Sequence, residues 1–155
     1  GPYIDRLLSQ VRGVRLKPMK VVCHAGNGCA GTIIDLLEGA LPVEWIKIDH
    51  DPDAALPNGI PNPLLPEKRA KARAAVIENG ADLGIAWDGD FDRCFFYDHR
   101  GNFVEGYYLV GLIAQTMLRS EPGGTILYDP RLTWNTEDLV TAAGGRPSIA
   151  KAQTS

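Results

Sequence analysis

Short apolar runs and segments of helical spacing alternate along the 155-residue chain. The ranges with strand character are 19–25, 43–49 and 82–87, of which the first and third are continuously apolar and therefore typical of buried strands. The ranges with helical spacing are 32–38, 67–79 and 107–118. Because strands and helices alternate, we expect an α/β fold with three α/β/α layers and a mixed, largely parallel sheet.

Two segments interrupt this alternation. Five prolines lie between residues 51 and 66, which predicts an irregular loop because proline has no backbone N–H and a fixed φ. Apolar residues at 94–97 and 103–105 flank the polar sequence Asp98 to Asn102. That pattern predicts two short strands joined as a hairpin.

A new alternation of strand and helix segments begins after the sequence EPGG at residues 121–124. A strand at 125–128, a helix at 136–143 and a strand at 147–150 are expected there. A single β-α-β unit cannot bury both faces of its strands. We therefore predict one domain at 1–122 and, at 123–155, an incomplete β-α-β segment of a following domain. Its open faces and edges predict either a monomer or an exchanged dimer.

The charge balance excludes two classes of partner. A net charge of −3 provides no basic surface for nucleic acid or for an anionic membrane. No apolar run approaches the roughly 20 residues of a membrane span.

The three cysteines, Cys23, Cys29 and Cys94, lack the C-x-x-C spacing, so we expect free thiols and a cytoplasmic location.

The first candidate motif is the turn Gly26–Gly31, with the sequence GNGCAG, between a predicted strand and a predicted helix. It fits the dinucleotide pattern G-x-G-x-x-G, and Asp49 ends the next strand, where a ribose-binding acid belongs. Glycines are also what a tight strand-to-helix turn requires for packing. The motif alone thus leaves a dinucleotide-binding module and a structural corner open. His24, just before the turn, is more typical of a hydrogen-bonded strand histidine than of a ligand-binding residue.

The second candidate motif is Asp88–Arg93, with the sequence DGDFDR, directly after a buried strand. Carboxylates at i, i+2 and i+4 repel one another, at about 4 kcal/mol per pair at ~4 Å and an effective dielectric of 20. A hard divalent cation such as Mg²⁺ takes oxygen ligands, so its binding makes the close approach of the three carboxylates favourable. Arg93 adds a group that grips phosphate oxygens. Metal and arginine together are typical of phosphoryl transfer.

Three other kinds of loop have similar sequences. An EF-hand requires glycine where Arg93 stands and glutamate where His99 stands, so that pattern fails. A D-x-D-x-T phosphatase loop fails because Asp92 replaces the threonine. A solvated acidic turn without a ligand stays open at the level of the motif.

Four blocks of the sequence resemble the α-D-phosphohexomutase superfamily and, within it, the bacterial phosphomannomutases. Asp88–Arg93 is similar to the family's metal loop, usually DGDGDR, with Phe91 in place of the second glycine. Residues 26–31 match the family's GNGxAG turn, and residues 57–66 and 129–136 look like two further phosphomannomutase loops. The likeness covers nearly the whole chain. It implies that the glycine turn is a structural corner and that the aspartate loop is the site.

The resemblance also implies a reaction. Family members have four domains, and this chain would be the second with the first β-α-β of the third. The complete enzyme would be an intramolecular phosphotransferase of the isomerase class that interconverts mannose 6-phosphate and mannose 1-phosphate through a phosphoserine and a bisphosphate. The phosphoserine, the sugar-selecting loop and the phosphate-binding domain are not recognisable here, so we expect the chain alone to be inactive.

Site residues are carried over by position. Asp88, Asp90 and Asp92 would hold Mg²⁺, and Arg93 would steady the transferring phosphoryl group as the catalytic residue of this domain. Arg131 would bind substrate, although a surface charge at a helix start explains it equally. Lys151 would do so as the lysine of the family's K-T/S-G-H segment, but residues 152–155 depart from that segment.

The expected partner is a phosphohexose, with no nucleic acid and no membrane. Mannose phosphate is favoured, and a related phosphoglucomutase domain is the alternative. A dinucleotide-binding module and an interaction module without metal or cofactor are the function classes that remain beside it.

Overall fold

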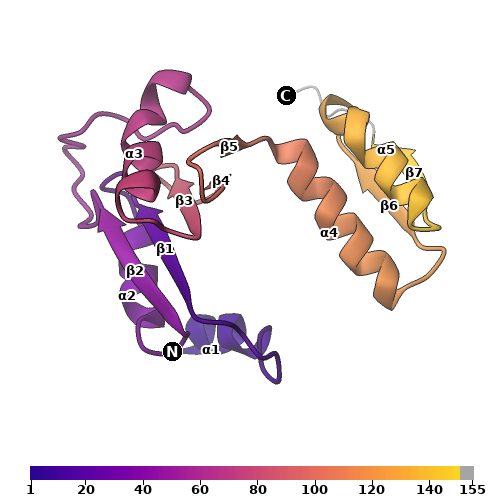
Figure 1. Cartoon of the computed structure of the whole chain (residues 1–155), viewed down its shortest axis with the longest axis horizontal. Helices are drawn as coiled ribbons and strands as arrows, with labels where there is room; N and C mark the ends of the chain where they lie inside the picture. The colour runs from indigo at the N-terminus through magenta and orange to yellow at the C-terminus, as the bar shows by residue number, and fades with distance from the viewer. Residues whose placement is uncertain (151–155) are drawn as a thin grey trace. The chain divides into compact units, whose positions relative to one another are not determined.

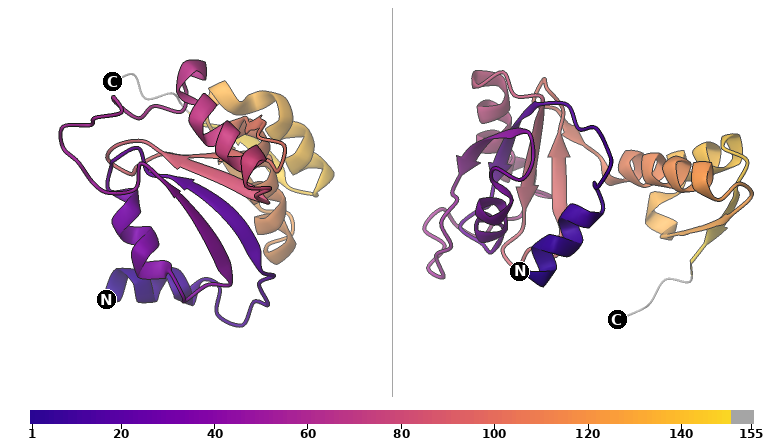
Figure 2. Two further views of the ribbon diagram at one scale, coloured as in Figure 1. Left: turned by 60° about the vertical axis from the view of Figure 1, so that its left-hand side comes forward. Right: turned by 90° about the horizontal axis from the view of Figure 1, so that it is seen from below.

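The computed structural model describes residues 1–150 and divides the chain into two compact units. The first unit is Gly1–Phe103, and the second begins at Val104. Each unit has its own sheet, as Figures 1 and 2 show. Each also has its own hydrophobic core.

The first unit contains a five-stranded sheet in the order β2-β1-β3-β4-β5. Its strands are β1 (Met19–His24), β2 (Val43–Ile48), β3 (Leu83–Trp87), β4 (Cys94–Tyr97) and β5 (Phe103–Val104). β1 pairs in parallel with both β2 and β3, whereas β3 pairs with β4 in the antiparallel direction. The mixed, largely parallel sheet predicted from the sequence is therefore confirmed.

Helices cover both faces of this sheet (Figure 1). On one face, Val21 and Cys23 of β1 pack with Ile34 of α2 (Ala30–Leu37). On the other, Val22 packs with Val76 of α3 (Ala70–Glu78). Successive strand residues point to opposite faces, so the continuous apolar run of β1 supplies both cores.

One helix of the first unit was not predicted. α1 (Pro2–Ser9) begins with proline at its first position, where the missing N–H costs no hydrogen bond. Ile4 is its one buried residue among the described positions, and the helix contacts α2. Eight residues with a single buried anchor give too weak a periodic signal for prediction from sequence.

Up to residue 150, the second unit contains two α-helices, the short 3-10 helix η2 (Pro130–Leu132) and a two-stranded parallel sheet (Figure 2). Its elements are α4 (Gly106–Ser120), β6 (Thr125–Tyr128), α5 (Thr133–Ala142) and β7 (Arg146–Ile149). Ala114 and Leu118 of α4 form a core with Val140 of α5. The approach is close, because a Cβ at Gly111 would lie 2.4 Å from Leu139 Cδ1.

The domain boundary predicted at 122 to 123 stays a prediction, and the compact units of the structure group the elements differently. The structure divides the chain between Phe103 and Val104, so α4 belongs with the β-α-β segment rather than with the five-stranded sheet. The physical reason is that the buried face of α4 packs against α5. That the second unit is the opening of a further domain stays a prediction.

The cysteines are free thiols, as expected. Cys23 is buried, and burial raises the pKa of its thiol to about 12. Cys94 lies in β4 as predicted but is exposed, and so is Cys29. Across residues 1–150, no helix combines the length and the apolar character that crossing a membrane requires.

The start of α2 provides a test of the packing between the glycine turn and β2. A Cβ at Gly31 would lie 1.9 Å from the backbone oxygen of His50, so Gly31→Ala forces the helix away from the end of β2. We expect the free energy of unfolding to fall by about 2 kcal/mol, in urea denaturation followed by tryptophan fluorescence. Gly106→Ala, at a position with no atom within 4 Å of the added Cβ, is the matched control. Equal stability of the two variants would contradict this packing.

Candidate metal centre

The carboxyl ends of the three parallel strands bring the candidate motifs to one edge of the sheet. β1 runs into the glycine turn, β2 ends just before Asp49, and β3 runs into Asp88. Because β1 lies between β2 and β3, the glycine turn is flanked by the other two segments. This edge is where α/β sheets place their ligands.

The three aspartates predicted from the sequence are brought together. One carboxylate oxygen from each of Asp88, Asp90 and Asp92 can be chosen so that all three lie within 4.8 Å of one another. Asp88 is buried, whereas Asp90 and Asp92 are exposed. Phe91 between them has φ of 66°, the left-handed region, and its ring packs on Trp87 at 5.8 Å between centroids. That aromatic contact stabilises the tight loop.

Arg93 lies against two of these carboxylates. Its Nε is 2.6 Å from Asp88 Oδ2 and 3.2 Å from Asp92 Oδ1, and its backbone N–H donates to Asp88 Oδ1 at 3.0 Å. Burial works to raise the pKa of Asp88, but the backbone N–H and the charge of Arg93 together with a hydrogen bond from Asp92 lower it overall. The same hydrogen bond to Asp88 raises the pKa of Asp92.

This donor set fits a hard divalent cation. The three side chains offer carboxylate oxygens alone, which Mg²⁺ and Ca²⁺ prefer. Asp88 Oδ2 is buried, and the charge that compensates it in this structure is the guanidinium of Arg93, with Nε 2.6 Å away. Asp90 is not paired with that arginine. A cation at the loop would offset the repulsion among the three carboxylates.

The glycine turn at 26–31 packs against the aspartate loop at 88–93. A Cβ at Gly28 would lie 2.6 Å from the backbone oxygen of Gly89, and Cys29 N–H donates to that oxygen at 3.3 Å. On its other side, a Cβ at Gly26 would lie 2.3 Å from Pro61 Cβ. Backbone and proline atoms thus occupy the space next to these glycines. The turn is a structural corner, and its glycines are required for close approach.

Asp49, the acid that the dinucleotide reading assigned to a ribose, is committed to internal partners. Its side chain is 10% exposed. One oxygen lies 3.1 Å from His24 Nε2, and the other accepts from Lys71 and, at 3.1 Å, from Asn58. The structure therefore favours the metal loop over a dinucleotide site.

Two asparagines that the sequence reasoning did not single out hold this edge together. Asn27 has φ of 59°, its N–H donates to the backbone oxygen of Asp49 at 2.6 Å, and its side chain donates to the oxygen of Asp51 at 3.0 Å. Asn58 Nδ2 donates to Asn27 Oδ1 at 2.8 Å. Both precede a glycine, and that pairing is the one sequence signal that could have identified them as turn residues.

The remaining candidates lie outside the first unit. Arg131 donates from Nε and Nη2 to Asp129, at 2.8 and 2.7 Å, and these hydrogen bonds lower the pKa of Asp129 to about 2. Its guanidinium is largely exposed. Lys151 lies outside the described residues. A role of either residue in binding substrate stays a prediction.

The fold and the loop together define a class: an α/β/α domain that presents three carboxylates and an arginine at the carboxyl edge of its parallel strands. The sequence profile described as "Phosphoglucomutase/phosphomannomutase, alpha/beta/alpha domain II" matches residues 1–101. The chain therefore belongs to the phosphoglucomutase/phosphomannomutase family.

Similar curated proteins carry names from the same family. The chain is 59% identical over 150 residues to the phosphohexose mutases of Xanthomonas campestris, covering 97% of this chain and 34% of that protein. It is 58% identical over 154 residues to the phosphomannomutase of Salmonella typhimurium, covering 96% and 34%. The chain thus spans about a third of the length of these relatives.

Solved structures share the fold. A phosphoglucomutase/phosphomannomutase family protein of Burkholderia thailandensis matches with a TM-score of 0.87 at 32% identity, over 96% of this chain and 33% of that one. An Aspergillus fumigatus N-acetylphosphoglucosamine mutase in complex with glucose 1,6-bisphosphate matches with a TM-score of 0.60 at 15% identity, over 96% and 31%. At that identity the second likeness concerns the fold alone.

His24 gives a pH dependence with a defined sign. Burial lowers its pKa below the usual 6.5, and the nearby Asp49 offsets this only in part. The folded state therefore binds fewer protons than the unfolded state. The contribution of neutral His24 to the free energy of unfolding is fully present above pH 6.5 and is lost as the pH falls through its folded-state pKa. We expect the free energy of unfolding to decrease from pH 7 to pH 5.

The matched variants for this prediction are His24→Asn and His99→Asn. The first should flatten the pH dependence of urea denaturation, and the second, at an exposed turn residue, should retain it. The carboxylates with lowered pKa act at more acidic pH and do not interfere in this window. An unchanged slope in His24→Asn would refute the assignment to His24.

Proposed function

We propose that this chain is the Mg²⁺-binding part of a phosphomannomutase that interconverts mannose 6-phosphate and mannose 1-phosphate. The observation that carries the proposal is the loop at 88–93, where three carboxylates and one arginine gather at the carboxyl edge of the sheet. The family assignment of residues 1–101 supports the same reading.

The residues of the loop have separate tasks in this proposal. Asp88, Asp90 and Asp92 hold Mg²⁺, which when bound neutralises charge on phosphoryl oxygens. Arg93 contacts those oxygens in place of the carboxylates that it touches in this structure. Its guanidinium is half exposed, so its side chain is free to turn toward a substrate. Phosphoryl transfer requires mainly this kind of positioning and electrostatic stabilisation.

The reaction of the complete protein would proceed in two transfers. A phosphoserine on another domain gives its phosphoryl group to the sugar phosphate, which forms a bisphosphate. The bisphosphate turns over, and its other phosphoryl group returns to the serine. Arg93 contacts the transferring phosphoryl group in both steps, because that group occupies the same position each time.

The names of the relatives support the substrate class. Similar proteins of known name are phosphomannomutases and phosphohexose mutases, and a related fold holds glucose 1,6-bisphosphate. We propose mannose phosphate as the substrate and a cytoplasmic location. Glucose phosphate is the second candidate, because the name phosphohexose mutase covers both sugars. Arg131 and Lys151 are proposed to contact the substrate in the complete protein.

The metal assignment predicts a local effect of Mg²⁺. In an NMR titration we expect shifts of the backbone amides of residues 88–93, with a dissociation constant on the order of 1 mM because few protein ligands are fixed. Asp90→Asn removes one charge of the donor set and should weaken binding further. Asp5→Asn removes the same charge from α1 and should leave the affinity unchanged. Amides at 88–93 that do not move in excess Mg²⁺ would refute the assignment.

The proposed division of labour among domains predicts that the 155-residue chain alone does not convert mannose 1-phosphate. The phosphoserine that donates the phosphoryl group belongs to another part of the protein. A coupled assay with the purified chain should give no rate above the buffer blank, with a full-length relative as the positive control. Measurable conversion by the chain alone would contradict this proposal.

A further inference from the structure

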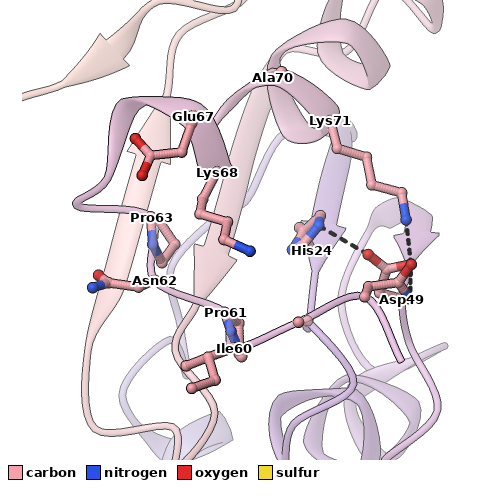
Figure 3. Close-up of a pocket in the computed structure, with 13 residues that line it drawn as sticks. His24, Asp49, Ile60, Pro61, Asn62, Pro63, Glu67, Lys68, Ala70 and Lys71 are labelled. Carbon is pink, nitrogen blue, oxygen red and sulfur yellow. Dashed lines mark hydrogen bonds and ion pairs between the residues drawn. The ribbon is translucent and has the colours of Figure 1, made fainter. Parts of the chain in front are cut away.

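A pocket of about 280 Å³ lies at the carboxyl edge of the first unit's sheet, and none of the residues of the metal loop lines it (Figure 3). Its walls come from the ends of β1 and β2, from the loop at 58–63, from the short 3-10 helix η1 (Pro66–Lys68) and from the start of α3. Pro61 separates the pocket from the metal loop, since it lines the one and lies 3.6 Å from the Cβ position of Gly89 in the other.

The topology explains why a pocket forms here. The connection after β1 leads to α2 on one face of the sheet, and the connection after β2 leads to α3 on the other face. Neighbouring parallel strands whose connections diverge leave a crevice at their carboxyl ends. In open α/β sheets such crevices bind ligands.

The charges around the pocket leave one cation without a partner. Asp49 and Lys71 neutralise each other, and Asp49 also pairs with His24. Within residues 1–150 the ammonium group of Lys68 makes no hydrogen bond or ion pair, although its backbone N–H donates to Leu65 O at 2.9 Å. Its Nζ lies 3.0 Å from the Cβ position of Gly59. Figure 3 shows Lys68 extended toward Pro61, whereas the carboxylate of Glu67 points away from His24 and Lys71.

The walls are rigid before any ligand arrives. Pro61 and Pro63 are buried, and Arg69 fixes the loop by donating from Nε to the oxygen of Pro63 at 2.8 Å and from Nη2 to that of Leu64 at 2.9 Å. The guanidinium of Arg69 in turn stacks on Phe103, with 3.5 Å from Cζ to the ring centroid. A preformed wall lowers the entropic cost of binding.

We propose that this pocket binds a small oxyanion, the phosphoryl or carboxylate group of a small molecule, through the ammonium group of Lys68. His24 and Asn58 line the pocket and supply polar surface beside that group. The site is distinct from the proposed metal centre and does not depend on Mg²⁺. It would give the domain a second anion-binding position on the same edge of the sheet.

The test is an NMR titration of the chain with inorganic phosphate and, separately, with acetate, both in the presence of a metal chelator. We expect saturable shifts of the backbone amides of Gly26, Asn58, Gly59 and Lys71. Lys68→Met keeps the apolar stem of an exposed side chain and should weaken binding at least about tenfold. Lys17→Met, which removes an exposed lysine before β1, should bind as the wild type does.

The outcomes separate the alternatives. Tighter binding of phosphate supports a phosphoryl ligand, and tighter binding of acetate supports a carboxylate. The proposal is overturned if neither anion gives saturable shifts, if Lys68→Met binds as tightly as the wild type, or if the shifts are confined to residues 88–93. Because the chelator removes Mg²⁺, a failure of the metal assignment leaves this result unaffected.

Discussion

The close contact between two backbone segments determines the arrangement of the candidate site. The turn after β1 packs against the loop after β3, with Gly28 against the carbonyl of Gly89 and the N–H of Cys29 bonded to it. Any side chain at Gly28 would occupy the space of that carbonyl. The carboxylates of the loop are therefore placed by a contact in which they take no part, and the sheet beneath keeps both segments at one edge.

This contact concentrates negative charge where little else offsets it. Asp88 is buried, and Arg93 is the cation that lies against it. Three carboxylates with one arginine cost stability in the absence of a ligand, because like charges are close together. A cation and a phosphoryl group would together satisfy the carboxylates and release the arginine. The geometry thus favours a site that is completed by its ligands.

A polar network stabilises the other side of the glycine turn. Asp49, Asn27 and Asn58 are joined by hydrogen bonds that tie the end of β2 to the turn and to the proline-rich loop. Such a network explains why an acid at the end of β2 need not bind a ribose: its Oδ1 accepts from Lys71 and Asn58, and its side chain is largely buried. It also leaves Lys68, at the rim of the adjoining pocket, as a cation available to a ligand.

The sequence by itself determined the order of the elements, the α/β class and the aspartate loop, because apolar periodicity and short motifs are local properties of the chain. All the strands from β1 to β7 agree with their predicted ranges to within one residue at each end. Only the tertiary structure decided the rest. It placed α4 with α5 rather than on the larger sheet, since an apolar helix face does not specify its partner. It also paired Asp49 with Lys71, packed the glycine turn against backbone, and left the ammonium group of Lys68 without a partner within residues 1–150. These outcomes depend on contacts between segments far apart in sequence.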